Sequence, residues 1–75
     1  MQRPRLTQLS ELSTLLVRCR ADRRLTLEDV RAETGLSVSW LSELETGKKK
    51  IANRIHVLRL EKFLVERGYP TKKAS

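Results

Sequence analysis

Hydrophobic residues recur along the chain at steps of three and four positions, a spacing that predicts amphipathic α-helices. The first such series contains Leu12, Leu16 and Cys19. It predicts a helix that begins after Thr7, whose hydroxyl can cap it, and that ends near Asp22. No stretch alternates hydrophobic and polar residues in the way that a half-buried strand does. The pattern therefore predicts an all-α protein.

The middle of the chain predicts two short helices joined by a tight turn. Thr26 is a good N-cap for the first helix, and Asp29, three residues later, can complete a capping box. Gly35 follows where the chain has to turn sharply, and glycine accepts positive φ without penalty. Ser37 can cap the second helix, and Gly47 is placed to end it.

A last helix is predicted over residues 53–67 and is stopped by Gly68 and Pro70. On a wheel of about 100° per residue, it carries two hydrophobic stripes on roughly opposite sides, where an ordinary surface helix carries one. One stripe contains Ile55, Leu58 and Val65, and the other contains Val57, Leu60 and Leu64. Either the first helix covers both stripes, or one stripe packs against a partner. We favour the partner.

The 75 residues allow one domain with one small core, and chains of this size often gain stability by forming oligomers. We divide the chain into a flexible arm (1–6), a folded domain (7–68) and a disordered basic tail (69–75). The single cysteine, Cys19, excludes an internal disulfide and is predicted to be a small core residue. The sequence shows neither a membrane-spanning run nor a signal peptide, which predicts a cytoplasmic protein.

Basic residues are concentrated in the second part of the chain. The net charge is +7, from 16 basic and 9 acidic residues. Residues 1–45 are balanced, so the excess comes from the nine Lys or Arg residues that follow, which are opposed only by Glu61 and Glu66. A polyanionic partner is the natural inference. A solvated basic surface is the alternative that charge alone leaves open.

The run LTLEDVRAETGLSVSWLSELETGKK, residues 25–49, resembles the helix-turn-helix of the lambda-repressor-like, or Xre-type, DNA-binding domains. Its most specific part is LSVSWLSELETGKK. The resemblance implies a compact four-helix bundle, with a five-helix bundle as the alternative. It also implies that the helix over residues 37–46 lies in the major groove of DNA, supported by the helix before it.

The resemblance assigns structural roles to several residues. It implies an ion pair between Arg20 and Glu45 that ties the first helix to the end of the third. The remaining structural residues are the turn glycine Gly35 and the hydrophobic positions Val30, Leu36, Leu41 and Leu44. The leucine spacing of the family favours Val57, Leu60 and Leu64 as the core stripe of the last helix, which leaves Ile55, Leu58 and Val65 for dimerisation.

One position departs from the family pattern. Arg31 stands where the family prefers alanine within the second helix. Either the long side chain of Arg31 extends past the third helix toward solvent, or Ala32 takes that place and the register shifts by one residue.

The resemblance also assigns the DNA contacts. Val38, Ser39, Trp40 and Glu43 match groove-facing positions, while Thr46 and the three following lysines match a loop that contacts phosphate. The candidate DNA-binding residues are Thr26, Ser37, Val38, Ser39, Trp40, Glu43, Thr46, Lys48, Lys49, Lys50 and Arg54. For Trp40 two roles remain open, because its ring could pack on sugar and phosphate or cover the junction between helices. Glu43 could accept a hydrogen bond from cytosine N4.

These features predict a sequence-specific transcriptional regulator of double-stranded DNA, a homodimeric repressor associated with the nucleoid. The alternative is a protein-interaction module of the same fold, such as an antitoxin or adaptor, and the acidic residues Glu28, Asp29 and Glu43 give it some support. An enzyme is not expected, since the single histidine, His56, and the scattered carboxylates form no catalytic or metal-binding pattern. No cofactor and no metal are predicted.

Overall fold

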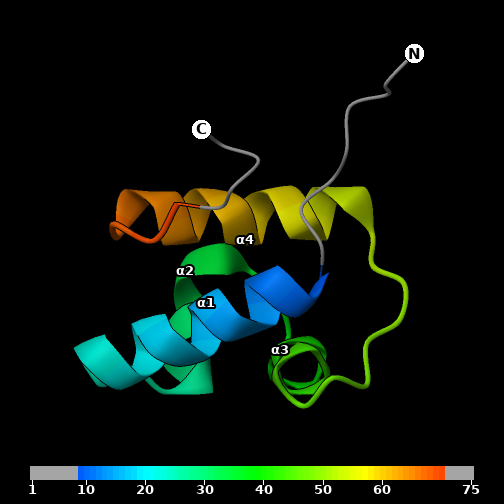
Figure 1. Ribbon diagram of the computed structural model, residues 1–75, viewed down its shortest axis with the longest axis horizontal. Coiled ribbons are helices and arrows are strands. Elements are labelled where there is room, and N and C mark those ends of the chain that lie inside the picture. Colours follow the sequence, from blue (N-terminus) through cyan, green and yellow to red (C-terminus); the bar gives the residue numbers. More distant parts are fainter. Residues whose placement is uncertain (1–8, 71–75) are drawn as a thin grey trace.

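The computed structural model describes residues 9–70, and these contain four α-helices (Figure 1). They are α1 (Leu9–Arg23), α2 (Leu27–Thr34), α3 (Val38–Glu45) and α4 (Arg54–Glu66). The prediction of an all-α fold is confirmed. The predicted cap Thr7, the arm over residues 1–6 and residues 71–75 lie outside the described part of the chain. Within that part, no helix is long and apolar enough to cross a membrane.

The helices enclose one hydrophobic core. Each of α1 and α2 packs against both α3 and α4, so that α1 and α2 lie between α4 and α3 in Figure 1. The core is mostly aliphatic, as the low aromatic content requires, with Trp40 and Phe63 as its aromatic members. Its buried side chains are Leu12, Leu16, Cys19, Val30, Leu36, Trp40, Leu41, Leu44, Val57, Leu60, Phe63 and Leu64. Burial raises the pKa of the Cys19 thiol, which disfavours the reactive thiolate.

The turn between α2 and α3 is built by the residues that the sequence indicated. The Thr26 side chain accepts from the Asp29 backbone amide at 3.0 Å, and the Asp29 carboxylate accepts from the Thr26 amide at 2.9 Å. This capping box begins α2 as predicted. Gly35 ends α2 with φ +78°, and its amide donates to the Arg31 carbonyl at 2.8 Å. Ser37 then caps α3 by accepting from the Trp40 amide at 3.0 Å.

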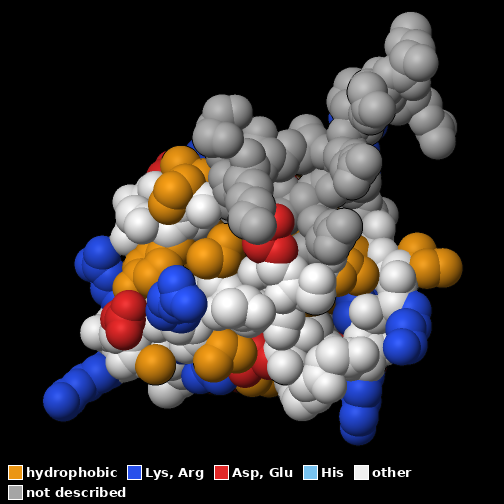
Figure 2. Space-filling view, in the orientation of Figure 1, with side chains coloured by type: hydrophobic (Ala, Val, Ile, Leu, Met, Phe, Trp, Pro, Cys, Tyr) orange, Lys and Arg blue, Asp and Glu red, His pale blue; other side chains and the backbone are white. Residues whose placement is uncertain are grey.

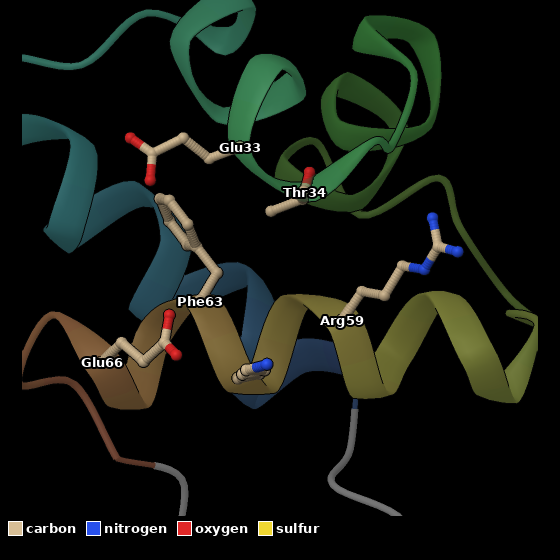
Figure 3. A pocket seen from close by; sticks show the side chains of 6 residues that line it. Glu33, Thr34, Arg59, Phe63 and Glu66 are labelled. Atoms are coloured by element: carbon tan, nitrogen blue, oxygen red, sulfur yellow. The ribbon is translucent and has the colours of Figure 1, made fainter.

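Arg59 of α4 lies close to the same turn. Its Nη1 atom is 3.1 Å from the place that a Cβ atom on Gly35 would occupy. Figure 3 shows the Arg59 side chain extending from α4 toward the turn. A cation at this position complements the partial negative charge at the C-terminus of α2. No local pattern predicts this contact, because Gly35 and Arg59 are 24 positions apart in the chain.

Arg31 does not disturb the packing of α2 on α3. Its side chain is exposed and forms an ion pair with Glu28 at 2.9 Å. Ala32 is exposed as well, whereas Val30 and Thr34 are buried. Burial therefore places Val30 and Thr34 in the core and does not separate the register with Arg31 at the family's alanine position from the one with Ala32 there.

The two stripes of α4 have different environments. Val57, Leu60 and Leu64 are buried in the core, as the preferred register predicted. The second stripe, which contains Ile55, Leu58 and Val65, is exposed. We call these three residues the outer stripe of α4. The first helix does not cover both sides of α4, so the outer stripe has no partner within residues 9–70.

The folded part of the chain includes Tyr69, which the sequence analysis had assigned to the tail. The Tyr69 amide donates to the Leu64 carbonyl at 2.8 Å, and its ring packs against the core. The Tyr69 hydroxyl donates to an Asp22 carboxylate oxygen, and this hydrogen bond raises the pKa of Tyr69. The chain after α4 is thereby fastened to the end of α1.

Candidate nucleic-acid interface

Helix α3 presents a narrow polar surface to solvent. Leu41 and Leu44 face the core, while Ser39 and Glu43 are exposed and Val38 is half-buried. We call the surface formed by Val38, Ser39 and Glu43 the outer face of α3. It contains hydrogen-bonding groups and one methyl-bearing side chain, which are the groups that can contact base edges in a DNA groove.

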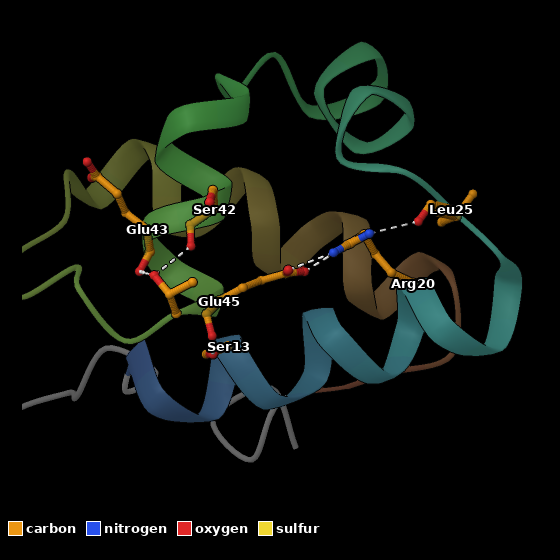
Figure 4. A network of polar contacts seen from close by, with 7 residues as sticks. Ser13, Arg20, Leu25, Ser42, Glu43 and Glu45 are labelled. Atoms are coloured by element: carbon orange, nitrogen blue, oxygen red, sulfur yellow. Dashed lines mark hydrogen bonds and ion pairs between the residues drawn. The ribbon is translucent and has the colours of Figure 1, made fainter.

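The end of α3 is tied to α1 by an ion pair. Arg20 Nε and Nη2 donate to the two carboxylate oxygens of Glu45 at 2.8 and 2.7 Å, a bidentate arrangement (Figure 4). Arg20 Nη1 also donates to the Leu25 carbonyl at 3.1 Å, and Ser13 Oγ donates to the Glu45 carbonyl. The hydrogen bond to Glu45 raises the pKa of Arg20. The ion pair implied by the resemblance is present, and it fixes α3 relative to α1.

The loop that follows α3 folds back onto the end of the helix. The amides of Lys48 and Lys49 both donate to the Glu43 carbonyl, at 2.9 and 3.2 Å. Thr46 Oγ1 donates to the carbonyls of Ser42 and Glu43, at 3.0 and 3.3 Å (Figure 4). The last carbonyls of a helix lack partners within it, and these donors supply them. The basic loop is therefore ordered and lies beside the outer face of α3.

A family model described as a helix-turn-helix domain matches residues 11–62, which span α1, α2, α3 and most of α4. The chain belongs to the helix-turn-helix domain family. Comparisons with curated proteins and with solved structures find no match. In this helix-turn-helix domain α2 is the first helix of the motif and α3 is the second, the helix that such motifs place in the major groove.

Trp40 is buried within the helix-turn-helix domain. Its side chain is 9% exposed, and its ring meets the His56 ring edge-on at 5.7 Å between centroids. Trp40 lies four residues before Leu44 on α3, and both belong to the buried core together with Leu36 of the turn. Of the two roles predicted for Trp40, this position favours the one that covers the junction between helices.

The three lysines of the loop have different environments. Lys48 and Lys50 are exposed. The Lys49 side chain is only 17% exposed, its Nζ atom lies 2.9 Å from Glu43 Oε1, and the same atom lies 5.4 Å from the centroid of the Trp40 ring. The resemblance implies the same phosphate-contacting role for all three lysines. Consecutive positions in an irregular loop point in different directions, and no local pattern indicated which one would turn inward.

The remaining candidate residues are exposed at the ends of helices. Thr26 and Ser37 cap α2 and α3, Arg54 is the first residue of α4, and Thr46 ends α3. In Figure 2, Lys and Arg side chains project around the loop that joins α3 to α4. Cations near the outer face of α3 suit a surface that approaches phosphates.

A groove between α2 and α4 lies outside this interface. Figure 3 shows Glu33 and Thr34 on one side of it and Arg59, Phe63 and Glu66 on the other. Opposite charges line it. Arg67 pairs with Glu33 and lies over the Phe63 ring at 4.2 Å. Nowhere in residues 9–70 do three or more His, Cys, Asp or Glu residues gather in a way that could hold a metal ion.

Proposed function

We propose that this helix-turn-helix protein is a sequence-specific transcriptional regulator of the lambda-repressor-like, or Xre, type. The observation that carries the proposal is the fixed position of α3. Its apolar side is locked into the core by Leu41 and Leu44, its end is held by the Arg20–Glu45 ion pair, and its polar outer face is left open. A rigid helix with one free polar side is what reading the major groove requires.

The phosphate contacts of this proposal come from the exposed cations beside α3. Lys48 and Lys50 belong to the ordered loop, and Arg54 begins α4. Each phosphate that a protein neutralises changes the slope of log affinity against log salt by about −0.9. These contacts carry no sequence information themselves, but they set the register in which the outer face of α3 meets the bases.

The alternative function is a protein-interaction module, which acidic residues near α3 favoured. The acidic residues that favoured it are each engaged within the protein. Glu28 pairs with Arg31, Asp29 completes the capping box of α2, and Glu43 pairs with Lys49. A carboxylate that already has a cationic or amide partner repels phosphate less than a free one. The acidic groups near α3 are therefore compatible with DNA.

We also propose that the protein binds DNA as a homodimer through the outer stripe of α4. Ile51, at the end of the basic loop, adds another exposed hydrophobic side chain near the start of α4. Positions 55, 58 and 65, together with the stem of Lys62, follow the three- and four-residue steps of a helix-to-helix contact. Two copies would read half-sites about 34 Å apart. Occupation of such a site would repress transcription by excluding other proteins from it.

The phosphate surface is tested by replacing Lys48 and Lys50 together with alanine. We expect binding to weaken on every DNA sequence and the salt slope to become shallower by about 1.8 per monomer. The measurement is fluorescence anisotropy with a labelled duplex over a series of salt concentrations. Arg18→Ala is the matched control, since Arg18 is an exposed cation of α1 that the proposal places in neither the phosphate surface nor the dimer contact. Equal slopes for the double variant and the wild type would contradict the proposed DNA-binding surface.

A further inference from the structure

Glu43, Lys49 and Trp40 form a cluster on the surface that is proposed to read DNA. Lys49 Nζ lies 2.9 Å from Glu43 Oε1 and 5.4 Å from the centre of the Trp40 ring. The cluster joins the exposed outer face of α3 to the buried junction of the helices. Lys49 belongs to this cluster, whereas Lys48 and Lys50 of the same loop are exposed.

Lys49 is held in this position from both ends. Its amide donates to the Glu43 carbonyl at 3.2 Å, and its ammonium group contacts the Glu43 carboxylate and the Trp40 ring. To reach a phosphate, the side chain would have to give up both the ion pair and the cation–π contact. Lys48 and Lys50 are exposed, and within residues 9–70 neither forms an ion pair or a cation–π contact of this kind. Within the loop, Lys49 is therefore the lysine least suited to contact phosphate.

The ion pair has a direct consequence for Glu43. Glu43 is the acidic residue on the exposed side of α3, and a mobile, unpaired carboxylate there would be repelled by the phosphates on either side of a groove. Lys49 compensates that charge and restricts the rotamer of Glu43. One contact with an ammonium group still leaves the carboxylate able to accept further hydrogen bonds. In the major groove, the donor that suits a carboxylate is the N4 amino group of cytosine.

We propose that Lys49 is a positioning residue that acts inside the protein, and that it makes Glu43 the cytosine-selecting group of α3. Lys48 and Lys50 contact the phosphates, while Lys49 sets base preference through Glu43. This assignment rests on the proposed DNA-binding function. It assigns affinity for phosphate and preference for a base to different lysines of the same run.

The test makes two measurements on the wild type and on the variants Lys49→Met, Glu43→Gln and Lys48→Ala. The first is selection of bound sequences from a randomised DNA library. The second is the salt dependence of the affinity for the selected site. Methionine keeps much of the lysine stem and removes the charge. We expect Lys49→Met to leave the salt slope unchanged and to reduce the preference for cytosine at one position, as Glu43→Gln does. Lys48→Ala should make the slope shallower by about 0.9 and leave the base preference intact. The double variant Glu43→Gln/Lys49→Met should lose no more preference than either single variant.

One further variant and a measurement without DNA complete the design. Lys49→Arg should restore the cytosine preference, because arginine can also pair with Glu43 and contact the Trp40 ring. Trp40 is the single tryptophan of the chain, so its fluorescence reports on the cluster in the free protein. Lys49→Met should change that emission, while Lys48→Ala should not. Unfolding of each variant in urea shows whether it is folded before binding is compared.

The outcomes separate this inference from the proposed function. If Lys49→Met makes the slope as shallow as Lys48→Ala does and keeps the cytosine preference, Lys49 contacts phosphate and the inference is wrong. An unchanged Trp40 emission in Lys49→Met would likewise overturn the cluster, whatever the DNA result. If the wild type binds no DNA at all, the proposed function fails, and the role of Lys49 in base preference fails with it.

Discussion

At the scale of single residues, the structural importance of an ion pair in this protein depends on how exposed its side chains are. Arg20 and Glu45 form a bidentate ion pair whose side chains are 26% and 12% exposed, and this pair joins α1 to the end of α3. Glu28 and Arg31 form a pair of similar length on the exposed surface of α2. Removing the partner of a partly buried charge lowers the free energy of unfolding more than removing the partner of an exposed charge, because water cannot replace the buried partner.

This difference predicts the cost of breaking each pair from one side. Arg20→Ala leaves the Glu45 carboxylate in a largely dry site and also removes the donor to the Leu25 carbonyl. We expect it to lower the free energy of unfolding by about 2 kcal/mol, below the 3–5 kcal/mol typical of fully buried pairs, because Arg20 is partly exposed. Glu28→Ala is the control, and we expect it to lower the free energy of unfolding by less than about 0.5 kcal/mol. Urea denaturation followed by circular dichroism measures both, and similar costs for the two variants would refute a structural role for Arg20.

At the scale of the helices, the hydrophobic spacing and the caps determine most of the fold. The steps of three and four residues predicted every described helix, and Thr26, Gly35 and Ser37 placed the turn of the motif. The two stripes of α4 predicted that only one side of that helix would enter the core. The outer stripe remains an exposed hydrophobic surface, which is a common property of protein contact sites.

The outer stripe predicts how α4 contributes to assembly. Leu58→Glu places a charge in the centre of the proposed dimer contact, so we expect the wild type to have the mass of a dimer and this variant the mass of a monomer. Val17→Glu is the matched control, because Val17 on α1 and Leu58 on α4 are each 47% exposed. Analytical ultracentrifugation gives the masses. The outer stripe is not the dimer interface if the wild type is a monomer, or if folded Leu58→Glu is still a dimer.

At the scale of the whole molecule, the limits of prediction come from contacts between distant segments. Lys49 was expected to contact DNA, and Trp40 either to contact DNA or to cover the junction between helices; in the structure Trp40 is buried and Lys49 turns toward Glu43. Their environments depend on how the loop after α3 returns toward α4, and spacing along one helix carries no information about that path. Arg59 beside Gly35 and Tyr69 beside Asp22 are further examples. By contrast, the Arg20–Glu45 pair was expected because a family resemblance conveys tertiary contacts that periodicity cannot.

The whole molecule combines a fixed α3, a basic loop at its end and an outer stripe on α4. Each of these features has a different role in the proposed account: base reading, phosphate binding and dimerisation. A dimer of this kind recognises two half-sites related by a two-fold axis, so symmetry in the protein should appear as symmetry in the DNA.

The most direct test of the central claim is selection of bound DNA from a randomised library at near-physiological salt, followed by sequencing. We predict an enriched inverted repeat whose half-sites are centred one helical turn apart, about 10 base pairs. Binding that is weak, sensitive to salt and without any enriched sequence would contradict the account, because it would show that the cations bind phosphate while α3 reads nothing.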